Sequence, residues 1–145
     1  MKITVLRTSL VVALFCFGVM GNTSAEETGK KEIVEKLEQI VTLRQSQLER
    51  QKAEVEGGLQ LNAIDAEIAL CRARLELARE RNELDHALAE LRQIESWIEK
   101  KIKEQESLAN LGRGSVQTLM EHQIELLEVQ IEQIRLETEL KGAAN

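Results

Sequence analysis

The chain of 145 residues has no proline, no tyrosine, one tryptophan and two phenylalanines. Both phenylalanines lie among residues 1–25, so Trp97 is the only aromatic residue in the rest of the sequence. Ordinary globular cores rely on bulky aromatic side chains, and ordinary loops rely on turn-forming residues. The residues that are abundant here, among them Ala, Glu, Leu, Lys, Arg, Gln and Ile, are typical of coiled coils and long helices.

An excess of basic residues is also missing. The formal net charge is −6, and removal of Lys2 and Arg7 with residues 1–25 would change it to −8. An acidic surface repels phosphate backbones, so we expect no nucleic-acid partner. The sequence has no run of Lys and Arg on one helix face, so we expect no binding to anionic lipids.

The first 25 residues have the pattern of a secretory signal peptide. Lys2 and Arg7 form a basic start, residues 10–20 are apolar, and small residues precede Glu26. The apolar run is shorter than the roughly 20 residues that a transmembrane helix needs. We therefore predict cleavage before Glu26, a periplasmic or secreted location, and no transmembrane segment in the mature chain.

Cleavage would leave Cys71 as the only cysteine. In an oxidising compartment a single thiol is either buried or available for an intermolecular disulfide. Cys71 falls on an apolar stripe, which favours burial, although the sequence leaves both possibilities open.

Apolar periodicity and glycine breakers predict three helices. The expected helices are residues 31–56, which Gly57 and Gly58 would end, residues 59–109 without a breaker, and residues 115–141, before Gly142. The predicted fold is all-α: an extended antiparallel coiled coil in which two tandem helical hairpins share one long central helix. The predicted segments are a signal peptide (1–25), a flexible start (26–30), a helical hairpin coiled-coil domain (31–141) and a flexible tail (142–145).

Short glycine turns favour antiparallel neighbours. The helix 31–56 would pack on the first half of the central helix, and the helix 115–141 would pack on its second half. The last helix carries two apolar lines: Met120, Ile124, Leu127, Ile131 and Ile134 on one face, and Leu119, Leu126, Val129, Leu136 and Leu140 on another. The central helix carries a line at every seventh residue, which we predict to be a self-association stripe in a homo-oligomer: Leu70, Leu77, Leu84, Leu91 and Ile98.

The sequence contains an internal repeat. Residues 66–84 align without gaps on residues 122–140, and Gly57 aligns with Gly114 one position out of step. Matching glycines at the expected corners indicate that a helical hairpin is repeated in tandem.

The segment "NLGRGSVQTLMEHQIELLEVQIEQI" resembles the periplasmic coiled-coil segment of the TolC-type outer-membrane efflux channel family. Gly112, Ser115 and the following apolar residues occupy the family's positions, whereas Thr118 replaces the family's usual Asp. The resemblance implies that the glycine corners are tips at which inner-membrane components dock. The residues of these tip turns are Gly57, Gly58 and Leu59, and Gly112, Arg113, Gly114 and Ser115. This chain has no membrane β-strand pattern of the family's kind, so it would correspond to the coil alone.

Two groups have spacings that would suit a metal ion: Glu83, His86 and Glu90, and Glu121, His122 and Glu125. Exposed helices of this composition produce such groups by chance, so we predict no metal site and no cofactor. Ser115 is expected to cap the last helix, and Trp97 is expected to pack rather than to bind.

No nucleophile and base converge in the pattern, so we expect no enzyme. The sequence predicts an exported coiled-coil protein that acts by protein–protein contact, as an accessory or remnant of a TolC-type efflux assembly. Its partners would be other copies of itself and efflux or envelope proteins. The alternative is a periplasmic holdase-like binder of unfolded or apolar clients, and metal sequestration is a third, weaker possibility.

Overall fold

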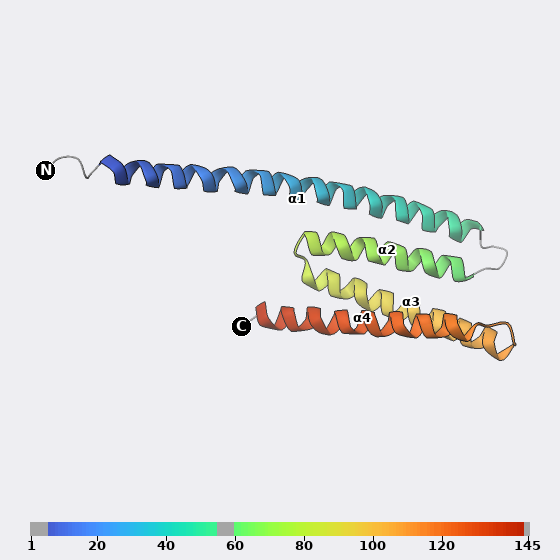
Figure 1. The fold of residues 1–145 in the computed structure, drawn as a ribbon. Helices are drawn as coiled ribbons and strands as arrows, with labels where there is room; N and C mark the ends of the chain where they lie inside the picture. Colours follow the sequence, from blue (N-terminus) through green and yellow to red (C-terminus); the bar gives the residue numbers. More distant parts are fainter. Residues whose placement is uncertain (1–5, 55–59, 144–145) are drawn as a thin grey trace. The chain divides into compact units, whose positions relative to one another are not determined.

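The computed structural model describes residues 6–54 and 60–143, and all the regular structure in those two ranges is helical. The four helices are α1 (Leu6–Glu54), α2 (Gln60–Glu80), α3 (Leu84–Asn110) and α4 (Val116–Ala143), as Figure 1 shows. The prediction of an all-α fold is confirmed. The chain divides into two units, Met1–Glu35 and Lys36–Asn145, which are described separately.

The first unit contributes the beginning of α1, and its helix starts at Leu6 rather than near Lys31. Residues 26–30, predicted to be a flexible start, are helical, so that expectation is wrong. Once a helix is nucleated, each added residue costs little, and the Glu and Lys residues here are good helix formers that outweigh the single Gly29. Cleavage before Glu26 stays a prediction. At the other end of the chain α4 continues to Ala143, past the predicted stop at Gly142.

In the second unit the predicted continuous helix over residues 59–109 is wrong, because the chain reverses direction between α2 and α3. Asn82 adopts a left-handed backbone conformation with φ of 60°. Its N–H donates to the Arg79 carbonyl at 2.9 Å, and the Glu83 N–H donates to the Ala78 carbonyl at 2.8 Å. These are the two hydrogen bonds of a helix-ending Schellman motif, with asparagine in the place that glycine usually takes.

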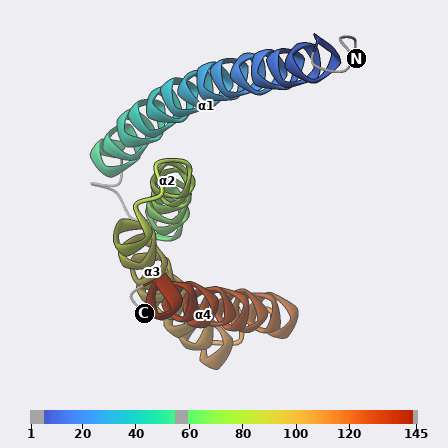
Figure 2. The same ribbon diagram turned by 90° about the vertical axis from the view of Figure 1, so that its left-hand side faces the viewer.

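The helix α3 packs against both α2 and α4 (Figures 1 and 2). Its Leu91, Ile94 and Ile98 are almost completely buried. Ion pairs show that both neighbours are antiparallel to α3: Lys101 Nζ lies 2.7 Å from Asp65 Oδ1 of α2, whereas Arg92 Nη2 lies 3.1 Å from Glu137 Oε1 of α4. The buried residues of this core are Ile64, Ile68, Cys71, Leu75, Ala78, Ala87, Leu88, Leu91, Ile94, Ile98, Val129 and Leu136.

A smaller apolar cluster joins α2 to the part of α1 that belongs to the second unit. It consists of Leu48, Ala66 and Leu70, with Val41 packed against it. Polar contacts recur along the same contact at intervals of seven residues on each helix: Arg81 with Glu38, Arg74 with Gln45, and Lys52 with Glu67. As the residue numbers rise on α1 they fall on α2, so these two segments are also antiparallel.

Candidate interaction surface

The helix α4 presents one apolar face to the core and another to solvent. Val129 and Leu136 are buried, and Leu126 and Leu140 pack partly against the same core. The other apolar line, here called the outer stripe, has exposed fractions of 50 to 64%: Met120 56%, Ile124 54%, Leu127 59%, Ile131 50% and Ile134 64%. The outer stripe is therefore apolar surface that nothing in the described part of the chain covers.

The self-association stripe predicted on the central helix is not an open line. Leu91 and Ile98 have 0% exposure in the core, and Leu70 is 2% exposed against α1. Leu77 and Leu84 are half-buried. The heptad count assumed one continuous helix, whereas the turn at Asn82 separates these five residues onto two antiparallel helices. They therefore do not form the predicted line along one helix.

Polar contacts along both edges of α4 fix which face points outward. On the α3 side, Gln130 Nε2 and Gln133 Nε2 donate to the two carboxylate oxygens of Glu95 at 2.8 and 2.9 Å. These hydrogen bonds hold the pKa of Glu95 below its ordinary value, with a smaller contribution from Arg92. The helix cannot roll about its axis without breaking them.

On the α2 side, Arg72 pairs with Glu125 at 2.5 Å and Arg79 pairs with Glu132. Both pairs join residues 53 positions apart, so α2 and α4 run parallel to each other here. A groove lies between the two helices, and the residues of both pairs line it. Glu128 and the apolar Leu91 line it as well. The two ion pairs tie α4 to α2.

The corner between α3 and α4 has the glycine geometry that the sequence predicts. Gly112 has φ of +70°, and the Arg113 N–H donates to the Leu108 carbonyl at 2.9 Å. A Cβ at Gly114 would lie 2.4 Å from the backbone nitrogen of Ala109. The predicted glycine corner is confirmed, and Gly112 takes the positive φ that glycine adopts more readily than other residues.

Beyond the corner, Ser115 Oγ accepts a hydrogen bond from the Thr118 N–H at 3.3 Å, which confirms its predicted capping role. Leu111 and Val116, on either side of the corner, are 69 and 70% exposed. The other predicted tip residues, Gly57, Gly58 and Leu59, lie outside the described residues.

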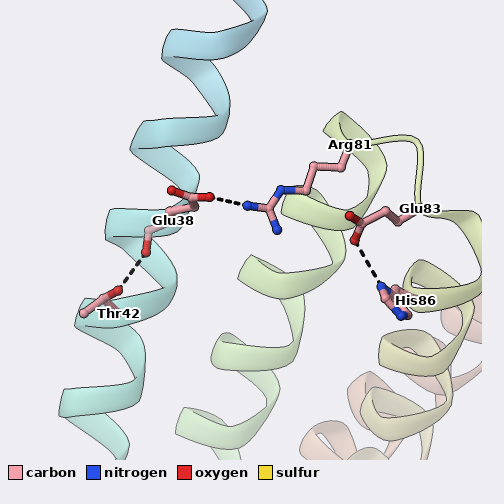
Figure 3. A network of polar contacts seen from close by, with 5 residues as sticks. All are labelled: Glu38, Thr42, Arg81, Glu83 and His86. Atoms are coloured by element: carbon pink, nitrogen blue, oxygen red, sulfur yellow. Dashed lines mark hydrogen bonds and ion pairs between the residues drawn. The ribbon is translucent and has the colours of Figure 1, made fainter.

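The two candidate metal groups do not converge. His86 Nδ1 lies 3.1 Å from Glu83 Oε2 at the α2–α3 turn, where Figure 3 also shows Arg81 reaching Glu38. Among residues 6–54 and 60–143, no three potential ligands come together. Glu90, the third member of the first group, is half-buried and instead acts on the pKa of Cys71.

His122, from the second group, is a buried member of the inner face of α4 with 9% exposure. Its Nδ1 is 3.9 Å from Glu125 Oε2. Burial, followed by the positive charge of Lys101, lowers the pKa of His122 below its ordinary value. The packing therefore favours the neutral form of the side chain.

Cys71 and Trp97 have packing roles, as predicted. The Cys71 thiol is buried, and this burial, together with Glu90, raises its pKa to about 12. A protonated, buried thiol is a poor nucleophile. Trp97 packs against the core, and Lys100 Nζ lies 4.0 Å from the centre of its ring.

Within the described residues, no helix has the length and apolar character that crossing a membrane requires. Comparison of the chain with protein-family models, with curated proteins and with solved structures gave no match. The resemblance to the TolC-type family therefore stays a prediction.

Proposed function

We propose that this protein acts by binding another protein through the outer stripe of α4. The single observation that carries the proposal is the exposure of all five stripe residues, by half or more, at coiled-coil spacing. Contiguous apolar surface of this kind is a common feature of protein-binding sites. An exposed line of this spacing on a helix is the form in which helical partners are recognised.

The energy available from the outer stripe is moderate. Full burial of an aliphatic side chain contributes about 1.5–3 kcal/mol, so five half-exposed side chains offer roughly 4–8 kcal/mol. Association costs about 4–15 kcal/mol in lost rigid-body freedom. A partner must therefore match the stripe closely and add contacts at its polar edges.

The resemblance to TolC-type channels suggests one kind of partner. By that analogy, we propose that the α3–α4 corner docks an envelope or efflux component after export of the chain. The exposed Leu111 and Val116 beside the corner support this proposal. The contact would be made at the tip of the hairpin, and the outer stripe would extend it.

The alternative is a holdase-like role, in which the outer stripe binds unfolded or apolar clients. The continuous exposed line from Met120 to Ile134 favours it, because an apolar client needs no matching side-chain pattern. The two functions differ in whether binding depends on the charge at the α3–α4 corner. Reversal of the exposed Arg113 at the corner should abolish docking of a tip partner and leave client binding unchanged.

The test is the loss of binding on substitution of the stripe. We expect Leu127→Glu with Ile131→Glu to abolish capture of partner proteins from envelope extract and binding of an unfolded apolar client. The matched control is Gln93→Glu with Ser96→Glu, which adds the same charge to exposed positions of α3. Equal binding by the stripe variant and the control would refute the proposal.

A further inference from the structure

We propose that the outer stripe is covered by the outer stripe of a second copy of this chain. In this pair the two α4 helices run antiparallel, with Glu121 of each chain opposite the partner's Arg135. The inference rests on the proposed function, because it names one protein that the stripe binds. It concerns a different surface from the line at residues 70–98, which the chain itself largely buries.

The spacing of the outer stripe defines the possible contacts. Its residues are separated by four, three, four and three positions, which is the alternation of a two-stranded coiled-coil seam. Two antiparallel registers lay this seam on its own copy. In the first, Leu127 faces the partner's Ile131, and Ile124 faces the partner's Ile134. In the second, Leu127 faces the partner's Ile124, and Met120 faces the partner's Ile131.

The charges beside the seam distinguish these registers. Glu121, Glu128 and Arg135 directly follow seam residues and occupy one edge of the stripe, where all three are exposed. The first register places Glu121 opposite the partner's Arg135, and two-fold symmetry forms this contact twice. The second register places Glu121 opposite the partner's Glu128, which is a repulsive contact made twice. Complementary flanking charges select the first register.

A parallel pair has no comparable contact. There the residues facing this edge would come from the other side of the stripe, where Gln123 and Gln130 carry no charge. The antiparallel register does bring Glu128 towards the partner's Glu128. This is one repulsive contact against two attractive ones, whereas the second register makes two repulsive contacts, so the flanking charges still favour the first register.

The size of the contact indicates a weak dimer. The seam from residue 120 to residue 134 is about 22 Å long at the helical rise of about 1.5 Å per residue. A single pair of helices over two heptads buries less than the roughly 800 Å² per partner of a standard stable interface. We therefore expect a dissociation constant on the order of tens of micromolar, because interfaces at this lower end are transient.

The test is a charge exchange in the protein as purified from cells, measured by sedimentation equilibrium. Glu121→Arg and Arg135→Glu each create two like-charge contacts, so each should weaken the dimer about ten-fold. The double variant, Glu121→Arg with Arg135→Glu, restores opposite charges and should return the dissociation constant to within about two-fold of the original. Leu127→Glu should give monomers whose helix content is unchanged in circular dichroism.

A well-folded monomer at several hundred micromolar would overturn the inference. Dimerisation that Leu127→Glu abolishes but that the charge exchange does not restore would overturn it too, because the register would be wrong. Either result leaves the proposed function standing if the stripe variant still loses its captured partners. Conversely, a dimer with the expected charge response, together with unchanged capture of other proteins by the variant with Leu127→Glu and Ile131→Glu, would support the inference and refute the binding of other proteins through the stripe.

Discussion

Lys101 Nζ lies 2.7 Å from Asp65 Oδ1, which ties the later part of α3 to the beginning of α2. In one continuous helix these residues would be on the order of 50 Å apart, at about 1.5 Å of rise per residue. The ion pair is possible only because the chain reverses at Asn82. The reversal gives α3 two neighbours within the chain, α2 and α4, and it leaves the outer face of α4 without one in the described residues.

Asn82 should control the stability of the α2–α3 turn. Its φ of 60° is a conformation that glycine adopts freely and that strains a residue with a Cβ. We expect Asn82→Ala to lower the free energy of unfolding by about 1 kcal/mol, and Asn82→Gly to leave it nearly unchanged. Urea unfolding followed by circular dichroism measures both. Equal stability of the alanine and glycine variants would contradict this account of the turn.

The two glycines of the α3–α4 corner should differ in their tolerance of alanine. Gly112→Ala should cost about 1 kcal/mol, because φ is +70° but the space around it is open. Gly114→Ala should cost more, because its Cβ would lie 2.4 Å from the Ala109 nitrogen and 2.6 Å from its Cα. Backbone atoms cannot move aside as a flexible side chain can. Unfolding midpoints give the order, and Gly142→Ala in α4, with nothing within 4 Å, is the control that should not lose stability.

Leu91 and Leu127 are two leucines with opposite surroundings, at 0% and 59% exposure. Leu91→Ala leaves a cavity between α3 and its neighbours and should lower the free energy of unfolding by about 2–5 kcal/mol. Leu127→Ala removes surface that solvent already reaches and should change it by less than about 0.5 kcal/mol. The comparison belongs at low micromolar concentration, where association does not contribute. A large loss in Leu127→Ala there would mean that the outer stripe is covered within the chain.

His122 should make the fold sensitive to mild acid. Burial comes first and the charge of Lys101 second among the causes that lower its pKa from 6.5, while Glu125, Asp65 and Glu121 act in the opposite direction. Below about pH 6.5 His122 becomes protonated in the unfolded chain but stays neutral in the folded chain until a lower pH. The free energy of unfolding therefore falls as the pH falls.

The measurement is the urea midpoint of unfolding at about pH 7 and at about pH 5. His122→Gln should flatten the decrease over this interval, and His86→Gln, at the exposed α2–α3 turn, should retain it. If both variants keep the full decrease, the acid sensitivity has another origin, such as the carboxylates.

Several parts of the fold are readable in the sequence because they depend on local physical chemistry. The abundance of helix-forming residues predicts an all-α chain. Glycine spacing predicts the corner at Gly112, and the position of Ser115 after that corner predicts its cap. The burial of Cys71 follows from its place on an apolar line that keeps its register along one helix. Each of these depends on residues only a few positions apart.

The turn at Asn82 shows where local signals are insufficient. Asparagine accepts the left-handed conformation, but it also occurs within helices at a modest cost, so a single asparagine does not require a stop. The reversal is stable because it lets α2 and α3 bury facing apolar lines against each other. This stabilisation comes from contacts between residues far apart in the sequence, so the periodicity of one segment does not reveal it.

The sequence by itself determined that this chain is helical, where the glycine corner lies, and that α4 carries two apolar lines. Only the tertiary structure decided which line is buried. Both consist of five large aliphatic or thioether side chains on one helix face, so hydrophobicity alone does not distinguish them. The choice comes from the edges of the helix, where Glu95 holds Gln130 and Gln133, and Arg72 holds Glu125. These contacts turn Val129 and Leu136 towards the core and leave Met120 to Ile134 facing solvent, because only one orientation satisfies both edges at once.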